Sequence, residues 1–243
     1  MSDTGDPTAE AMEHVARQPA AGALDGVVGA LHRLCSAAVG ALAASGAGVS
    51  VMAEDGARGV AAASDPASER IEELQFVLGE GPCMDAFASR RPVLVPDLTD
   101  GAANRWPAYT TAAHDGGVRA VFAFPLQVGA ARLGVLDVFR ARAGPLTGAE
   151  LRQAFAFTDL AVRTLLDAQD DALGGAAADG MDEAIEHSAE LFQAQGMVMV
   201  QLGVPLAEAL VRIRAYTYAE NRRLNDVARD IVARRLHFDP DHS

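Results

Sequence analysis

Residues 119–140 read RAVFAFPLQVGAARLGVLDVFR, and this stretch decides the fold of the larger part of the chain. β-Branched and aromatic residues fill both of its halves, which favours strands over Arg119–Val128 and Arg132–Arg140. Gly129-Ala130-Ala131 lies between the halves, and a short connection that contains Gly is typical of a hairpin. We therefore expect two antiparallel strands here.

On both sides of this hairpin, the pattern alternates between helices and strands. Apolar residues recur at steps of three and four over residues 23–44, which predicts a helix. Thr147-Gly148-Ala149-Glu150 is a capping box in front of a second long helix. The other elements that we expect are strands at Val49–Ala53, Arg58–Ala63 and Val93–Val95, a helix from Pro66 that ends at Gly79-Glu80-Gly81-Pro82, a short helix at Cys83–Ser89, and a helix or loop at Asn104–His114. Together they predict an α+β fold, in which helices cover a largely antiparallel sheet.

The chain from Met181 onward contains no run that resembles a strand. Its apolar spacing predicts three helices, at about Asp182–Leu202, Leu206–Ala219 and Leu224–Leu236. Short connections join them, so this part is expected to form an all-α three-helix bundle. A bundle of about sixty residues is marginally stable alone, and we expect a partner or a neighbouring domain to support it.

These patterns divide the chain into four parts. Residues 1–20 are polar with Gly and Pro, so we expect a flexible tail. The α+β domain takes residues 21–172, and the helical domain takes residues 182–238. Gly174, Gly175 and Gly180 mark a linker over residues 173–181.

The composition excludes several classes of enzyme. All 20 basic residues are Arg, so no Schiff-base lysine, Walker lysine or kinase lysine is available. No G-x-S-x-G motif occurs, and we expect no catalytic activity. The six histidines show no spacing typical of metal ligands, so we expect no metal site. Two cysteines, Cys35 and Cys83, do not make a disulfide framework.

The charge is unevenly distributed. The net charge is −13, yet residues 191–243 carry seven Arg against six acidic residues, so the first 190 residues hold −14. An acidic body with an Arg-rich end suggests two functions on one chain, although a surplus of one charge is small for a nucleic-acid binder. The apolar stretches are too short to span a bilayer, and the first residues do not resemble a secretory signal. We expect a cytoplasmic protein without a membrane contact.

Two families resemble parts of this sequence. Residues 23–168 resemble a GAF domain, through Leu78-Gly79-Glu80-Gly81-Pro82-Cys83 and through Leu133-Gly134-Val135-Leu136 in the hairpin. The C-terminal part resembles an ANTAR domain. The residues that carry this second resemblance are Gln193-Ala194-Gln195-Gly196-Met197-Val198-Met199, Glu208-Ala209, Arg214, Asn221-Arg222, Leu224 and Val227-Ala228. The order GAF then ANTAR is familiar from actinobacterial regulators.

The resemblance implies a function that the composition does not show. ANTAR domains bind paired hairpin loops in nascent transcripts and prevent transcription termination, so the expected partner is RNA. GAF domains sense small ligands or redox state, or dimerise. The sequence does not identify a ligand or cofactor for this GAF domain.

The candidate RNA-binding residues follow from the ANTAR resemblance and from the chemistry of their side chains. Adjacent guanidinium groups on a short turn can bind phosphates or stack on bases, and an exposed Tyr can stack on a base. Many ANTAR domains have Lys where this chain has Gln195, and Gln cannot neutralise a phosphate. The candidates are Gln195, Arg214, Tyr218, Asn221, Arg222 and Arg223.

Each candidate also has a purely structural interpretation. The pair Arg222-Arg223 could complement the carbonyl end of the preceding helix. Arg214 could pair with Glu208, and Tyr218 could be a core residue. Gly196 in mid-helix is best explained by the close approach of another helix.

Cys83 and Trp106 are the candidates for lining a ligand cavity in the GAF domain. Cys83 follows Gly-Pro at the start of a helix, where thiolate character is favoured, but a single cysteine is more often an inert packing residue. Trp106 lies between two expected strands, where core packing is the simpler interpretation.

Two further points stay open in the sequence. Three short helices also suit a helix-turn-helix, so a DNA-binding regulator is the alternative to an RNA-binding one. We also expect a homodimer, because the helix at Asp182–Leu202 carries two apolar stripes. Ile185, Leu191 and Val198 form one, and Phe192 and Met199 form the other.

Overall fold

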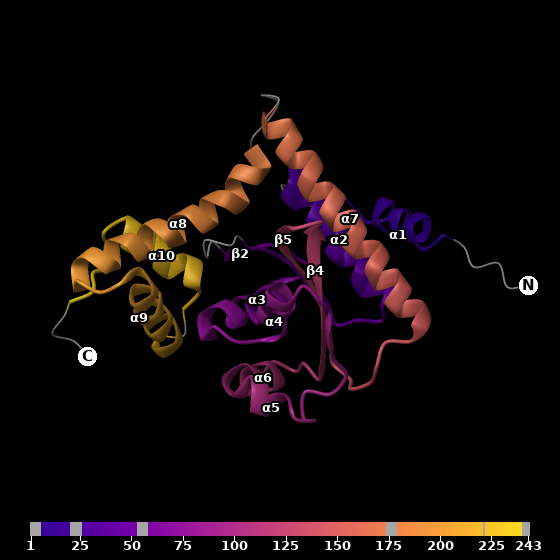
Figure 1. Ribbon diagram of the computed structural model, residues 1–243, viewed down its shortest axis with the longest axis horizontal. Coiled ribbons are helices and arrows are strands. Elements are labelled where there is room, and N and C mark those ends of the chain that lie inside the picture. Colours follow the sequence, from indigo (N-terminus) through magenta and orange to yellow (C-terminus); the bar gives the residue numbers. More distant parts are fainter. Residues whose placement is uncertain (1–5, 20–25, 53–57, 174–178, 221, 240–243) are drawn as a thin grey trace, which may run out of the picture. The chain divides into compact units, whose positions relative to one another are not determined.

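A five-stranded antiparallel sheet is the centre of residues 1–184 in the computed structural model (Figure 1). The structure describes residues 6–19, 26–52, 58–173, 179–220 and 222–239. The strand order is β2-β1-β5-β4-β3. The strands are β1 (Gly46–Met52), β2 (Arg58–Ala63), β3 (Val93–Val95), β4 (Ala120–Val128) and β5 (Ala131–Arg140).

The hairpin predicted from residues 119–140 is confirmed as β4 and β5. Phe122 pairs with Val138 and Phe124 with Leu136, and Gly129 takes a positive φ of 57° in the turn. β5 also pairs with β1, so the hairpin supplies two of the three inner strands of the sheet.

Helices cover both faces of the sheet, as Figure 1 shows. Phe122, Phe124, Leu136 and Val138 face an apolar core shared with α2 and α7. Val121 and Phe139 point to the opposite face, because side chains alternate along a strand. The first face carries α1 (Pro7–Ala16), α2 (Gly26–Ala41) and α7 (Gly148–Leu173), and the second carries α3 (Pro66–Leu78), α4 (Pro82–Ser89), α5 (Ala102–Arg105) and α6 (Pro107–Asp115).

The expectation of a flexible N-terminal tail does not hold for residues 7–16, which form α1. The Asp6 carboxylate accepts a hydrogen bond from the Thr8 N–H at 2.9 Å and caps this helix. Ala11 is fully buried in the core with α2 and α7. Small alanines give little apolar periodicity, so composition alone pointed to a tail.

Helix ends follow the local signals in the sequence. The Asp65 side chain caps α3 by accepting from the N–H groups of Ala67 and Ser68. Gly79 ends the same helix in the left-handed conformation, at φ 72°. The capping box before α7 is also formed, because the Thr147 N–H donates to Glu150 Oε2 at 2.7 Å and the Glu150 N–H donates to Thr147 Oγ1 at 3.2 Å.

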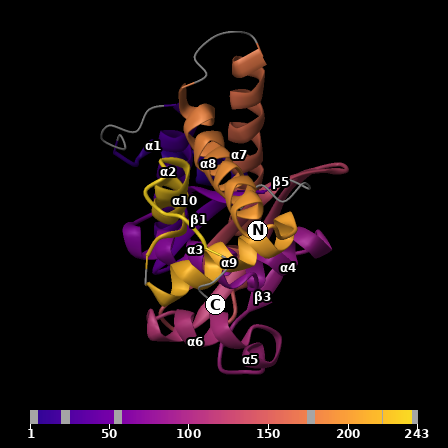
Figure 2. The same cartoon turned by 90° about the vertical axis from the view of Figure 1, so that its left-hand side faces the viewer.

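Residues 185–243 form a second unit, built from helices only in the part that the structure describes (Figure 2, orange to yellow). Its helices are α8 (Asp179–Leu202, which begins in the first unit), α9 (Leu206–Ala219) and α10 (Leu224–Val232). The fully buried side chains Val198, Ile213, Val227 and Ile231 form its core. The three-helix prediction for this part is confirmed.

α10 ends four residues earlier than the apolar pattern predicts. Arg234 has a positive φ of 57°, and the N–H groups of Arg235 and Leu236 both donate to the Asp230 carbonyl. The chain therefore turns back after Val232, and Leu236 lies outside the helix. None of the helices in the described residues is both long and apolar enough to cross a membrane.

A glycine in β5 gives the first testable prediction. A Cβ on Gly134 would lie 1.9 Å from the Ser50 carbonyl oxygen, whereas a Cβ on Gly40, exposed on α2, would meet nothing within 4 Å. We expect Gly134→Ala to lower the free energy of unfolding by at least about 2 kcal/mol, because the β1–β5 pairing must shift.

Gly40→Ala is the matched control. It should leave the free energy of unfolding unchanged or raise it by up to about 1 kcal/mol. Denaturant unfolding followed by fluorescence measures both, since the chain has one Trp, Trp106, buried in the first unit. Equal stabilities of the two variants would contradict the prediction.

Candidate nucleic-acid interface and buried polar cluster

The exposed face of α9 carries large apolar side chains. Tyr218 is 68% exposed and Val211 57% exposed. At 100° per residue these two and the exposed Ala215 lie on one face of the helix. This stripe leads directly into the turn that carries Arg222 and Arg223.

Arg222 is held in place by α10. Its Nη2 donates to Asp230 Oδ2 at 2.6 Å, and its side chain remains 34% exposed. The same carboxylate accepts from Arg235 Nε at 2.8 Å. The hydrogen bond with Asp230 raises the pKa of Arg222, and the two arginines lower the pKa of Asp230. Arg223 follows as the exposed N-cap residue of α10.

Tyr216 and Tyr218 of α9 differ in their surroundings. The Tyr216 ring packs edge-on against Phe238, with 5.6 Å between ring centroids. Tyr218 points to solvent, so it is not a core residue. Arg214, one turn before Tyr218 on α9, is half-buried.

The structure does not present Gln195 on the surface. Its side chain is buried in the bundle, and its Nε2 donates to the Leu206 carbonyl at 2.7 Å. The Gln195 amide therefore joins α8 to the first residue of α9. The Gln195 side chain is therefore not part of the exposed surface of this unit. Asn221, the remaining candidate, lies outside the described residues.

A groove of about 560 Å³ lies in the second unit. Gly196 lines it, and a Cβ there would meet nothing within 4 Å, so the described residues do not show the close helix approach that we expected. The lining residues are Gln193, Gly196, Met197, Val200, Gln201, Arg234 and His237. Val200 is 74% exposed beside it.

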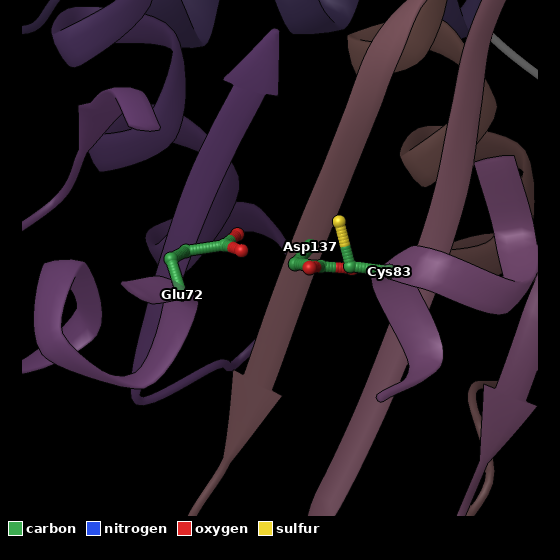
Figure 3. Close-up of side chains that lie close together, drawn as sticks. All are labelled: Glu72, Cys83 and Asp137. Atoms are coloured by element: carbon green, nitrogen blue, oxygen red, sulfur yellow. The ribbon is translucent and has the colours of Figure 1, made fainter. Parts of the chain in front are cut away.

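A second group of polar side chains is buried in the first unit, on the α3–α4 face of the sheet. Figure 3 shows Glu72 of α3 directed toward Asp137 of β5, with Cys83 of α4 beside Asp137. One ligand atom from each of these three residues lies within 4.8 Å of the others, and all three side chains are fully buried.

Gln75 connects the members of this cluster. Its Nε2 donates to Asp137 Oδ2 at 2.8 Å and to Glu72 Oε2 at 3.2 Å, and its Oε1 accepts from the Cys83 N–H at 2.8 Å. Ser50 Oγ donates to Glu72 Oε2 at 3.3 Å. Burial raises the pKa of both carboxyl groups, and the charge of Asp137 raises the pKa of Glu72 further.

Comparison with known proteins assigns both units. A family model for the GAF domain matches residues 27–166, more than half of the chain. The chain belongs to the GAF domain family. It also carries an ANTAR domain, matched over residues 179–232. That this order of domains marks an actinobacterial regulator stays a prediction.

Solved GAF domains share the fold at low sequence identity. The GAF domain from the Acinetobacter phosphoenolpyruvate-protein phosphotransferase is 11% identical, with a TM-score of 0.51 over 70% of this chain and 99% of that chain. The GAF domain of a phosphoenolpyruvate-protein phosphotransferase from Coxiella burnetii is 19% identical, with a TM-score of 0.50 over 70% and 94%. No curated protein sequence matches the chain.

The segment Leu78–Cys83 of the GAF domain positions several elements around the polar cluster. Gly79 ends α3, and Glu80 Oε1 accepts from the N–H groups of Ala108 and Tyr109 at the start of α6. Gly81 has φ 146°, and a Cβ there would lie 2.5 Å from Gln75 Oε1. The motif therefore needs glycine where it passes Gln75.

The structure separates the two GAF residues that the sequence singled out. Cys83 belongs to the polar cluster. Trp106 is buried in an apolar cluster with Leu98 and Tyr109, and Arg105 stacks over its ring at 4.2 Å. Sequence reasoning did not find Glu72 and Asp137. The sequence did offer one signal for Asp137, because it is an acidic residue between apolar neighbours on a strand that is buried on both faces. An acidic residue in such a place indicates a buried polar site.

The open environment of Gly196 in the ANTAR domain gives the second prediction. Gly196→Ala should stabilise α8 by up to about 1 kcal/mol, because Ala is the better helix former and its Cβ meets no atom. Amide hydrogen exchange over α8 should slow by up to about fivefold. The opposite change, Ala215→Gly on exposed α9, should speed exchange over α9. Faster exchange over α8 in Gly196→Ala would show that a Cβ is not accepted there.

Proposed function

We propose that this chain is a cytoplasmic RNA-binding regulator of transcription antitermination. Its ANTAR domain would bind paired hairpin loops in nascent RNA, under the control of the GAF domain. The match to the ANTAR family supports this, and one observation carries it to named residues: Tyr218 is 68% exposed next to the turn that carries Arg222 and Arg223. Both domains are regulatory types, and we propose no catalytic step.

The proposed surface combines two kinds of contact. A base unstacked in a loop can stack on Tyr218, which contributes about 1–3 kcal/mol per base in single-stranded complexes. Arg222 and Arg223 can bind the phosphates that flank that base. Since the whole chain carries a net charge of −13, long-range electrostatics oppose non-specific binding to nucleic acid. Recognition then depends on local contacts with splayed bases.

Substitutions on α9 and its following turn test this surface. Tyr218→Ala should weaken binding to a paired-hairpin RNA by about tenfold or more and leave the salt dependence unchanged, because stacking involves no counterion. Arg223→Ala should weaken binding and reduce the slope of log affinity against log salt by about 0.7 to 0.9. Band shifts over a salt series measure both effects.

Arg212→Ala is the matched control, since it removes the same charge from another face of α9. Arg212 pairs with Glu208 at 3.4 Å on the exposed side of the helix. This variant should bind RNA as the unchanged protein does. A loss in Arg212→Ala equal to that in Arg223→Ala would indicate a general charge effect and would contradict the proposed surface. Preference for duplex DNA over hairpin RNA in the same assay would favour the DNA-binding alternative.

We also propose a homodimer, because paired hairpins match two linked RNA-binding domains through effective concentration. Of the apolar stripes on α8, Leu191 and Val198 are buried within the second unit, while the side chains of Ile185 and Phe192 lie outside the described residues. A changed GAF state would then alter the spacing of the two ANTAR domains. Light scattering at micromolar concentration should give a mass near twice 25.3 kDa. A monomer mass that does not rise with concentration or with RNA contradicts the dimer.

A further inference from the structure

The polar cluster of the GAF domain has the geometry of a small-ion site. Glu72, Cys83 and Asp137 come from α3, α4 and β5, and their ligand atoms lie within 4.8 Å of one another. Three atoms at such separations have a common centre within about 2.8 Å of each, while Zn–S and Zn–O bonds are about 2.3 and 2.0–2.2 Å. Side-chain shifts of less than 1 Å would close the site.

Several oxygens in this cluster have no hydrogen-bond partner. They are Glu72 Oε1, Asp137 Oδ1 and the hydroxyl of Tyr109, all on fully buried side chains. Burial raises the pKa of Tyr109, and the charges of Asp137, Glu72 and Cys83 raise it further. Leaving buried polar atoms unpaired costs about 1–3 kcal/mol each, and a bound ion would offset this cost for the carboxylate oxygens.

The surrounding side chains hold the potential ligands in one orientation. Gln75 binds Oε2 of Glu72 and Oδ2 of Asp137, so the other oxygen of each carboxylate is the one left open. Gln75 also fixes the backbone of Cys83. Hydrogen bonds that orient metal-binding carboxylates in this way are typical of metal centres. A Cβ on Gly48 would lie 2.6 Å from Glu72 Oε1, so a glycine leaves room for that oxygen.

We propose that Glu72, Asp137 and Cys83 bind one Zn²⁺ ion in the GAF domain. The donor set favours zinc, because one thiolate with carboxylates suits Zn²⁺, while Mg²⁺ and Ca²⁺ prefer oxygen alone. A divalent ion also compensates carboxylate charge in a place without water access. The expectation of no metal site rested on the six histidines, and this site uses none of them.

The competing occupants are a proton shared between Glu72 and Asp137, or a buried water. A buried water would hydrogen-bond to the carboxylates, but unlike Zn²⁺ it would not form a bond with the Cys83 thiolate. Zinc uptake should release protons and weaken on acidification, because thiol and carboxyl groups bind the metal in their deprotonated forms.

Metal titration of the full chain tests the site. After treatment with a chelator, the protein should take up one Zn²⁺ per chain in competition with a chromophoric chelator, on prolonged incubation because the ligands are buried. Co²⁺ in its place should show a thiolate-to-cobalt charge-transfer band in the near ultraviolet. Asp137→Asn and Glu72→Gln should each lower zinc affinity by at least tenfold.

The two buried cysteines supply a matched pair of variants. Cys83→Ser should abolish the cobalt–thiolate band, whereas Cys35→Ser should keep it, since Cys35 is buried in the core with α2 on the opposite face of the sheet. Circular dichroism checks that each variant is folded. If Cys83→Ser fails to fold, the Cys35→Ser protein decides, because Cys83 is then its one thiol.

Absence of stoichiometric zinc, or a cobalt complex without a thiolate band in Cys35→Ser, overturns the proposal and leaves the cluster to a proton or water. Unchanged zinc affinity in folded Asp137→Asn and Cys83→Ser does the same. These measurements use no RNA, so their failure leaves the proposed function of the ANTAR domain untouched.

Discussion

The side chain of Gln75 joins three elements of the GAF domain that are distant in sequence. Through one amide it contacts a carboxylate on β5, a carboxylate on its own helix and the backbone at the start of α4. The placement of α3 and α4 on the sheet therefore depends on a polar interaction inside an otherwise apolar layer. A low local dielectric strengthens such bonds and makes each unpaired group costly, so the cluster functions as a unit.

Local chemistry explains which parts of the fold could be predicted from the sequence. The β4–β5 hairpin and the α7 capping box depend on residues that are neighbours in the chain, and both are present as expected. α1 was missed because its burial rests on alanine, whose small side chain leaves a weak periodic pattern. The early end of α10 depends on the Asp230 carbonyl, which accepts two N–H groups beyond the helix.

The candidate sites divide in the same way. Tyr218 and Arg223 could be named from the sequence because the ANTAR resemblance singles out the end of the second helix and the turn after it, but the exposure of Tyr218 became clear only in the structure. Gln195 could not be judged, because its partner is a backbone carbonyl at the start of the next helix. Glu72 and Asp137 are 65 residues apart in the sequence and meet only through the packing of α3 on the sheet. One sequence without a fold contains no signal for that pairing.

The carboxylate of Asp230 has a consequence for how the ANTAR turn meets an anion. It already binds Arg222 and Arg235, so a phosphate that reaches Arg222 competes with Asp230 for the same guanidinium. The gain from that contact is reduced by whatever the charge-assisted hydrogen bond to Asp230 loses. An isolated phosphate gains little from such an exchange. A phosphate on an RNA whose bases also stack on the protein gains additional binding free energy. Asp230 therefore favours anions that make several contacts over simple anions.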